Sequence, residues 1–251
     1  MDSAQINLNQ VSFAYEKDRN ILKNISFHAD AHDSIGLVGA NGAGKSTLLK
    51  LLVGLNLNFT GEIHVCGLPV KKETLPRIRE SIGYVFQDSE SQHLMSTVYE
   101  DVAFAPRNYG LPEEEVEQRV SHALELVGIT HLKDKQIYKM SGGEKKLASI
   151  ATILSMTPDI ILMDEPSIAL DPRNRRNLIR ILNSFDQLKI IASHDLDMIL
   201  DTCERTILID NGEIICDGDT RDILSNRELL ENHGLELPLC MGRSLAESEP
   251  Q

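Results

Sequence analysis

The chain has 251 residues, of which 41% are hydrophobic and 25% charged, and its formal net charge is −13. Its length allows a sizeable core, and its composition is ordinary for a globular protein. The acidic excess argues against nucleic acid as a partner, because phosphate binding needs a basic surface. We expect no signal peptide and no membrane span, since the first residues lack a basic start and no apolar run reaches about 18 residues. If the protein functions at a membrane, we expect it to do so from the cytosolic side and through a partner protein.

The first part of the chain predicts strands that lead into a glycine-rich turn. Val11, Phe13 and Tyr15 alternate with polar neighbours, as in a half-buried strand. A short apolar run over residues 34–38 ends in glycines, and residues 47–53 are typical of a helix that stops at a glycine. The predicted order is therefore strand, glycine-rich turn, helix.

The middle of the chain predicts an inserted helical region. Residues 113–127 carry apolar side chains on one face, begin after Pro112 and end before Gly128. Residues 88–112 are polar and predict irregular structure. We expect a mostly helical subdomain over about residues 88–155, inserted into an α/β core.

The rest of the core is predicted to be strands again. Residues 160–163 and 189–193 are continuous apolar runs, as expected of parallel strands buried on both faces. Asn211 and Gly212, between two short apolar runs, predict a hairpin. We expect one domain over residues 1–240 and a polar, frayed tail over residues 241–251. The four cysteines are too far apart in sequence for a C-x-x-C pair and are expected to be buried thiols.

A motif that fits G-x-x-x-x-G-K-[ST] follows the first core strand and precedes a helix. Its glycines let successive backbone N–H groups face one point, and the helix N-terminus adds positive dipole there. Lys45 can reach the β- and γ-phosphates of a nucleotide, and the Ser46 hydroxyl can bind Mg²⁺. A chance glycine-rich turn is the alternative, which the order of strand, loop, lysine, hydroxyl and helix disfavours. The predicted phosphate-binding residues are Gly39, Ala40, Asn41, Gly42, Ala43, Gly44, Lys45, Ser46 and Thr47.

Two carboxylates follow the buried strand predicted at residues 160–163. An acid at the end of such a strand lies at the carboxyl edge of the sheet, where α/β proteins bind ligands. Asp164 is predicted to hold Mg²⁺ through its water shell, because Mg²⁺ loses water reluctantly. Glu165 is placed to accept a proton from the water that attacks the γ-phosphate, or to orient that water. The alternative is a solvated turn that carries two acids.

A second anion site is predicted where Ser141, Gly142, Gly143 and Glu144 precede an apolar, helix-like run. A serine and two glycines at a helix start expose backbone N–H groups. One nucleotide needs one phosphate loop, so the second site is expected to serve a nucleotide that is bound to another copy.

With these motifs the sequence resembles the ATPase subunits of ABC transporters, over roughly residues 5–235. The resemblance implies an α/β fold with a P-loop NTPase core on a mainly parallel sheet, an N-terminal antiparallel β subdomain and an inserted helical signature subdomain. It implies ATP and Mg²⁺ as cofactors. It identifies Gln87 with the glutamine loop, which touches Mg²⁺ and faces the membrane partner, and residues 167–171 with the D-loop. His194 matches the switch histidine near the γ-phosphate, and Tyr15 matches the aromatic residue that stacks on adenine, although packing in a strand is the alternative for Tyr15. The expected catalytic residues are thus Glu165, His194, Lys45 and Gln87, and the expected metal ligands are Ser46, Gln87 and Asp164.

Three positions depart from the family pattern. Met140 replaces a leucine of similar volume, which is expected to be mild. Glu144 replaces glutamine, and related importers tolerate this change. In the D-loop, Ile168-Ala169 stands where Ala-Gly is commoner, which is expected to alter packing between subunits.

Residues 87–92 and 97–104 resemble the ATPases of energy-coupling-factor importers, including the cobalt and nickel type. This resemblance implies a homodimer, or a heterodimer with a paralogue, under a transmembrane coupling protein joined to a substrate-capture membrane protein. The subunit would then lie at the cytoplasmic face of the cell membrane, and the cargo would be a vitamin or a metal ion. Acids around the expected docking surface would suit an arginine-rich coupling helix, although a solvated acidic face is the alternative. These acids are Asp88, Glu90, Glu100 and Asp101.

Other classes of protein remain open. The ATPase of another ABC transporter class would carry the same motifs. A soluble ABC ATPase for translation or DNA repair usually has tandem cassettes or a long coiled-coil insertion, and a P-loop kinase lacks the signature. An ATP-dependent assembly module without catalysis is a further alternative, because of the D-loop change.

Overall fold

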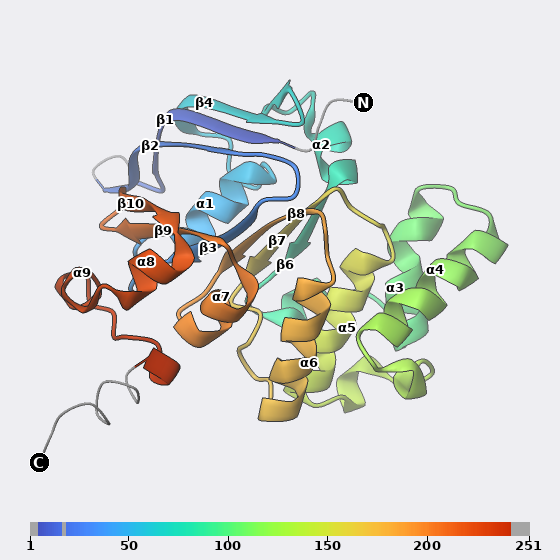
Figure 1. The fold of residues 1–251 in the computed structure, drawn as a ribbon. Helices are drawn as coiled ribbons and strands as arrows, with labels where there is room; N and C mark the ends of the chain where they lie inside the picture. The colour runs from blue at the N-terminus through green and yellow to red at the C-terminus, as the bar shows by residue number, and fades with distance from the viewer. Residues whose placement is uncertain (1–4, 17–18, 242–251) are drawn as a thin grey trace, which may run out of the picture.

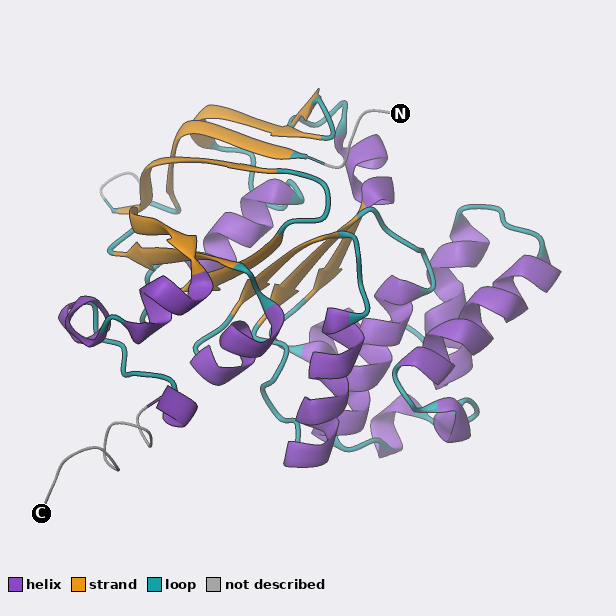
Figure 2. Ribbon diagram, in the orientation of Figure 1, coloured by secondary structure: helices purple, strands orange, loops and turns teal. Residues whose placement is uncertain are grey.

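The computed structural model describes residues 5–16 and 19–241. Most of the predicted polar tail, residues 242–251, lies outside the described residues. Two sheets form the framework, and they appear as the orange strands of Figure 2. No described helix is both long and apolar enough to cross a membrane.

The larger sheet has six strands in the order β10-β9-β3-β8-β7-β6. All neighbours are parallel except β9 and β10, which form an antiparallel hairpin. Asn211 and Gly212 have φ of 49° and 80° in the turn, and two positive φ values are what a two-residue type I′ turn requires. The strands are β3 (Ser34–Val38), β6 (Ile82–Val85), β7 (Ile160–Asp164), β8 (Leu188–Ala192), β9 (Arg205–Asp210) and β10 (Glu213–Asp219).

The smaller sheet is antiparallel, in the order β2-β1-β4-β5, and confirms the predicted N-terminal β region. Its strands are β1 (Ile6–Ala14), β2 (Asn20–Ala29), β4 (Phe59–Val65) and β5 (Leu68–Pro69). Helix α1 (Lys45–Leu52) lies between the two sheets (Figure 1). Its leucines share one apolar cluster with β1, β2 and one face of β3, β7 and β8. The predicted order of strand, glycine-rich turn and helix is therefore confirmed.

The central strands are apolar on both faces because each face packs against a separate layer. In β7, Ile160 and Leu162 join the cluster around α1, whereas Ile161 and Met163 join the cluster on the opposite side. Successive side chains of a strand point to opposite faces, so a strand covered on both sides needs a continuous apolar run. The opposite side is covered by α5 (Gly142–Leu154), α6 (Pro172–Asn183) and α7 (Leu196–Thr202).

Three α-helices lie between β6 and β7 in the chain, namely α3 (Val98–Asn108), α4 (Glu113–Leu126) and α5. The prediction of a helix at residues 113–127 is confirmed, and its apolar face is buried. The remaining helices are α2 (Leu75–Ser81), α8 (Thr220–Ser225) and α9 (Arg227–Asn232).

The prediction of irregular structure over residues 88–112 is wrong, because this segment contains α3 as well as a 3-10 turn over Ser89–Gln92. Pro106 inside α3 hid the helix, since proline lacks the N–H that should bond the carbonyl of Val102. The Ser155 hydroxyl donates to that carbonyl at 2.9 Å instead. At the other end, Thr97 caps the helix by accepting the Glu100 N–H at 3.3 Å. A hydrogen bond from a residue distant in sequence thus stabilises a helix that the local sequence disfavours.

Candidate nucleotide site

The glycine-rich loop curls between the end of β3 and the start of α1. Gly39, Gly42 and Gly44 have φ of 152°, 84° and 110°, which side chains rarely allow. At Gly39 an added Cβ would lie 2.1 Å from the Ile209 carbonyl oxygen, so only glycine fits. The loop forms one wall of a cavity of about 380 Å³. This cavity is lined by Tyr15, Arg19, Ile21, Asn41, Gly42, Ala43, Gly44, Lys45, Ser46, Thr47, Gln87 and Glu165.

Lys45 lies inside the curl of this loop. Its ammonium donates to the carbonyl oxygens of Gly39 at 2.7 Å and Ala40 at 3.2 Å, and the residue is only 6% exposed. Burial lowers the pKa of Lys45, while the nearby carboxylates of Glu165 and Asp164 oppose this effect. A buried cation held by two loop carbonyls can transfer its hydrogen bonds to the oxygens of a bound phosphate.

The Asp164 carboxylate and the Ser46 hydroxyl lie in direct contact beside the loop. The Ser46 hydroxyl donates to Asp164 Oδ1 at 2.8 Å, and the Tyr84 hydroxyl donates to Oδ2 at 3.4 Å. Asp164 is 2% exposed, and burial raises the pKa of its carboxyl group. A buried carboxylate beside a hydroxyl, both next to a phosphate loop, is a donor set that fits Mg²⁺, which prefers hard oxygen ligands.

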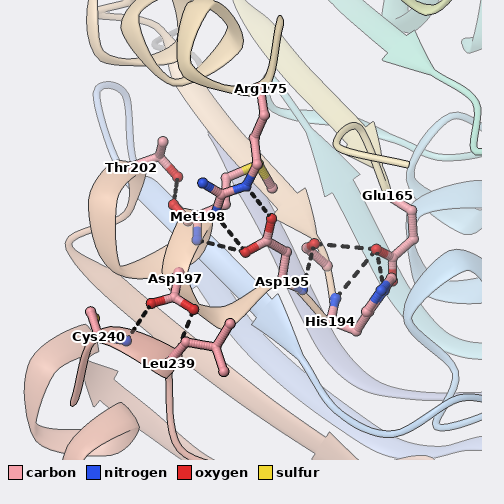
Figure 3. A network of polar contacts seen from close by, with 10 residues as sticks. Glu165, Arg175, His194, Asp195, Asp197, Met198, Thr202, Leu239 and Cys240 are labelled. Atoms are coloured by element: carbon pink, nitrogen blue, oxygen red, sulfur yellow. Dashed lines mark hydrogen bonds and ion pairs between the residues drawn. The ribbon is translucent and has the colours of Figure 1, made fainter. Parts of the chain in front are cut away.

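Glu165 is held at the carboxyl edge of the sheet by two residues that follow β8 (Figure 3). Its Oε2 accepts from Ser193 Oγ at 3.2 Å, from His194 Nδ1 at 2.8 Å and from the His194 backbone N–H at 3.3 Å. Glu165 is 5% exposed and has a φ of 47°, an uncommon conformation for a residue with a side chain. The predicted pair of Glu165 and His194 is thus brought into direct contact.

The same network extends to α6 and α7 through residues for which the sequence indicated no role. Asp195 accepts two hydrogen bonds from the Arg175 guanidinium, at 2.6 and 2.7 Å, and caps α7. Its own backbone N–H donates to Ser193 Oγ at 3.0 Å. Figure 3 shows the result, a continuous chain of contacts from Arg175 to Glu165. The sequence did contain a signal for Ser193 and Asp195, because these residues flank His194 in a polar triplet that directly follows a core strand.

Asp197 connects this region to the last described segment of the chain. Its carboxylate accepts the backbone N–H groups of Leu239 at 2.9 Å and Cys240 at 3.0 Å (Figure 3). Segment 235–240 thereby borders a groove of about 810 Å³ that also contains Ile168 and His194.

Tyr15 lies just past the end of β1, and its side chain is not buried in the sheet. The residue is 58% exposed, and its ring meets Phe13 edge-on with ring centroids 4.8 Å apart. Its hydroxyl lies 3.4 Å from Thr47 Oγ1 in the loop helix. The exposed ring at the rim of the cavity favours the stacking role over packing within a strand. Gln87 is also exposed and lines the same cavity.

Comparison with known proteins identifies this arrangement. The model of the ABC transporter family matches residues 22–168. A protein of Geobacter sulfurreducens named as an ABC transporter ATP-binding protein is 48% identical over 236 residues, which cover 94% of this chain and 95% of that protein. The chain belongs to the ABC transporter family.

Two other ABC proteins are similar over nearly the same length. The energy-coupling factor transporter ATP-binding protein EcfA of Carboxydothermus hydrogenoformans is 37% identical over 239 residues, which cover 94% of this chain and 88% of that protein. The solved structure of cbiO1 from Clostridium perfringens, described as part of the ABC transporter complex cbiONQ, superposes with a TM-score of 0.81 at 31% identity. The superposition covers 97% of this chain and 99% of cbiO1. ATP is thus the nucleotide of this ABC domain.

The ABC signature, residues 141–144, forms the N-terminus of α5. Ser141 accepts the Glu144 N–H at 3.3 Å, and the Glu144 carboxylate accepts the Ser141 N–H at 2.7 Å, which together make a capping box. Lys135 donates to both Glu144 oxygens at 2.8 Å and, with the Ser141 N–H, lowers the pKa of Glu144. Glu144 therefore supplies the carboxylate half of the capping box at the start of α5.

The structure does not bring the signature to the loop cavity of its own chain. Ser141 and Gly142 are exposed, and among the described residues the cavity lining includes none of 141–144. Gly142 instead lines a neighbouring groove of about 560 Å³, together with Asp164 and Gln87.

The unusual D-loop pair, Ile168-Ala169, strains the backbone at Ala169 and contacts the signature. Ala169 has a φ of 68°, where glycine is the unstrained residue. Its carbonyl oxygen lies against the signature, since a Cβ on Gly143 would come within 3.2 Å of it. Ile168 is 36% exposed beside this contact. This contact does not explain the backbone strain at Ala169.

One acid assigned to the docking surface does not lie on it. Asp101 is 5% exposed and accepts His93 Nδ1 at 2.6 Å and the N–H groups of Leu94 and Met95 at 2.8 and 3.0 Å. It therefore fixes the loop before α3 and cannot meet a partner. The prediction for Asp101 is wrong. Glu90 is exposed and pairs with Lys145, and Glu100 is also exposed.

The cysteines are only partly as expected. Cys203 is buried, Cys66 and Cys216 are half-buried, and Cys240 is exposed.

Proposed function

We propose that this chain is the ATP-hydrolysing subunit of an energy-coupling-factor type ABC importer, which couples hydrolysis to the uptake of a metal ion or a vitamin. Relatives named EcfA and the likeness to cbiO1 support this branch of the family. Residues 1–240 would form one ATPase domain, with residues 88–155 as its helical subdomain. The chain would bind at the cytoplasmic face of the cell membrane, to a coupling protein and a substrate-capture protein.

The proposed roles follow the geometry of the cavity. Tyr15 would stack on adenine, and the loop amides with Lys45 would hold the β- and γ-phosphates. Ser46 and Asp164, together with Gln87, would hold Mg²⁺, which when bound neutralises charge on the phosphates.

Glu165 would accept the proton of the attacking water, because it is a buried carboxylate that lines the cavity beside the phosphate loop. His194 Nδ1 lies 2.8 Å from that carboxylate, and the His194 ring is more than half exposed. It would therefore orient Glu165 and contact the γ-phosphate.

The observation that carries the dimer is the separation of two anion sites on one chain. The loop at residues 39–47 has its own cavity, while the exposed signature lies outside that cavity. A serine and two glycines at an open helix N-terminus suit a phosphate, so we propose that each signature caps the nucleotide of a neighbouring copy, head to tail. The neighbour would be a second copy or a paralogue.

Glu165→Gln tests this proposal. The variant keeps the shape of Glu165 but cannot take a proton, so ATP with Mg²⁺ should trap a stable dimer, measured by light scattering after gel filtration. Lys45→Ala in the same background should stay monomeric, because it cannot hold the phosphates. Turnover by Glu165→Gln at the wild-type rate would overturn the role of Glu165, and a monomer with bound ATP would overturn the dimer.

The membrane partner is tested at the exposed acids. We expect the charge reversals Glu90→Lys and Glu100→Lys to release the subunit from membranes of cells that express the whole transporter, while ATP affinity is unchanged. The buried Asp101 is unsuitable for this test. Recovery of both variants in the membrane fraction at the wild-type level would remove the docking surface from the proposal.

A further inference from the structure

Among the residues that the structure describes, Lys146 is the largest of the fully buried side chains, although lysine is almost never buried to this extent. Only 1% of the residue is exposed. Its ammonium donates to the carbonyl oxygens of Phe86 at 2.9 Å and Gln87 at 2.8 Å. The lysine belongs to α5, whereas both carbonyls belong to the loop that presents Gln87 to the nucleotide cavity.

The positive charge of the buried Lys146 ammonium is partly compensated by nearby carboxylates. Three carboxylates act on it, from Asp164 at the end of β7, from Asp88 in the glutamine loop and from Glu165 after β7. Burial still dominates and lowers the pKa of Lys146 to about 8. An apolar residue would fill the same space without this penalty, so the two hydrogen bonds to the loop are the feature that only a long cationic side chain supplies.

These hydrogen bonds fix the backbone on which Gln87 depends. One carbonyl belongs to Gln87 and the other to the residue before it, so together they define the peptide planes on both sides of the Gln87 Cα. A second link from α5 reaches the same loop through Gln92, which accepts the Phe86 N–H at 3.2 Å and donates to the Ser149 carbonyl at 2.8 Å. The Gln87 side chain is exposed and makes no such anchor among the described contacts, so its place is set by this backbone.

The same helix also carries the signature. Ser141 caps α5, and Lys146 follows about one turn later on the same helix. In the proposed dimer the N-terminus of α5 would contact the nucleotide of the neighbour, while Lys146 would hold the loop that reaches the nucleotide of its own chain. A short rigid helix would then connect the two nucleotides.

We propose that Lys146 is a positioning residue that holds Gln87 at the nucleotide of its own chain and makes that position depend on what α5 meets at its signature end. The coupling part rests on the proposed head-to-tail dimer. The positioning part rests only on the contacts within one chain.

Lys146→Met is the principal variant, because it removes the charge and both hydrogen bonds at nearly the same length. We expect faster amide hydrogen exchange in residues 86–92, measured without nucleotide. We expect kcat to fall at least about tenfold, the equivalent of losing one of the two hydrogen bonds from the charged donor, with ATP affinity changed less than about twofold. The Hill coefficient for ATP hydrolysis should fall from near two to about one.

Two further variants separate positioning from general stability. Lys189→Met is the matched control, since Lys189 is a buried lysine at the amino end of β8 that donates to the Phe185 carbonyl at 2.9 Å. It should lower Tm as much as Lys146→Met does and leave kcat and the Hill coefficient unchanged. Lys146→Arg should recover most of the activity, because its two N–H groups can meet both carbonyls and the adjacent groove of about 560 Å³ gives room.

Combination with Gln87→Ala decides whether Lys146 acts through Gln87. If it does, Lys146→Met should cost little further activity in the Gln87→Ala background. Additive losses would overturn the proposal, as would wild-type exchange in residues 86–92. Should Lys146→Met not fold, Lys146→Gln, which keeps one donor group, replaces it in every comparison.

The outcomes distinguish this inference from the proposed function. If wild-type protein does not dimerise with ATP, the head-to-tail dimer fails and the exchange measurement alone still decides the positioning role. If wild-type protein dimerises with a Hill coefficient near two and Lys146→Met retains that value, the coupling between the two nucleotides is wrong.

Discussion

Ser193 offers the sharpest test of how the carboxylate of Glu165 is oriented. Its hydroxyl is fully buried, donates to Glu165 Oε2 at 3.2 Å and accepts the Asp195 N–H at 3.0 Å. Ser193→Ala removes one hydrogen bond to a carboxylate, which is worth about 1.5–3 kcal/mol. If that bond is needed in the transition state, kcat should fall about tenfold to a hundredfold while KM for ATP stays within about twofold.

The assay is steady-state phosphate release at saturating Mg²⁺ and ATP, with nucleotide affinity measured separately. Ser34→Ala is the matched control, because it removes a buried hydroxyl at the amino end of β3 that donates to the Thr202 carbonyl at 2.6 Å. It should lower the free energy of unfolding by about 1 kcal/mol without changing kcat.

A double-mutant cycle with Glu165→Gln then tests the reasoning. If Ser193 acts through Glu165, single-turnover rates should show little further loss when Ser193→Ala is added to Glu165→Gln. A full tenfold loss in that background would mean that Ser193 acts elsewhere, and the account of the network would be refuted.

The remaining predictions concern other parts of the molecule. Tyr15→Ala should raise the Kd for ATP by about 5-fold to 150-fold, from a stacking energy of about 1–3 kcal/mol, whereas Tyr15→Phe should change it little; equal losses would exclude stacking. Asp101→Asn should lower the free energy of unfolding by about 1–3 kcal/mol in urea denaturation, and Glu100→Gln by less than about 0.5 kcal/mol, since only the first removes buried acceptors; similar values would contradict the assignment of Asp101 to the loop. Burial raises the pKa of Cys203 to about 11, so at pH 8 only about one molecule in a thousand carries its thiolate, and a thiol reagent should modify Cys240 first and Cys203 only on unfolding. Fast modification of Cys203 in the folded protein, mapped by mass spectrometry, would contradict this.

Several parts of the fold could be predicted because they depend only on residues that are close together in the sequence. The glycine-rich loop was predictable because Gly39, Gly42 and Gly44 must adopt positive φ between a strand and a helix. The central strands were predictable since burial on both faces demands an unbroken apolar run. The hairpin at Asn211 followed from turn chemistry alone.

The errors came from contacts that the sequence cannot display. Helix α3 was missed because Pro106 argues against a helix, and the compensating hydroxyl of Ser155 lies 53 residues from the carbonyl that it satisfies. Asp101 was assigned to a surface because an acid next to other acids gives no sign of burial.

The site shows the same division. Glu165 was expected from its place after a buried strand and His194 from the family resemblance, but Arg175 was not expected, because only the packing of α6 beside α7 brings it to Asp195. The role of Lys146 could not be predicted for the same reason, since its hydrogen-bond partners lie on a loop distant in sequence. Residues that act on a ligand can be found by motif, whereas residues that position them require the fold.

The central claim is that one nucleotide is shared by two chains, and a disulfide between chains tests it most directly. In a cysteine-free Glu165→Gln background, one preparation carries Asn41→Cys in the phosphate loop and a second, differently tagged, carries Ser141→Cys in the signature. Mixed with ATP and Mg²⁺ and then oxidised, they should form a cross-linked dimer that carries both tags, and without nucleotide they should not. A dimer that forms with ATP but gives no such cross-link would contradict the claim.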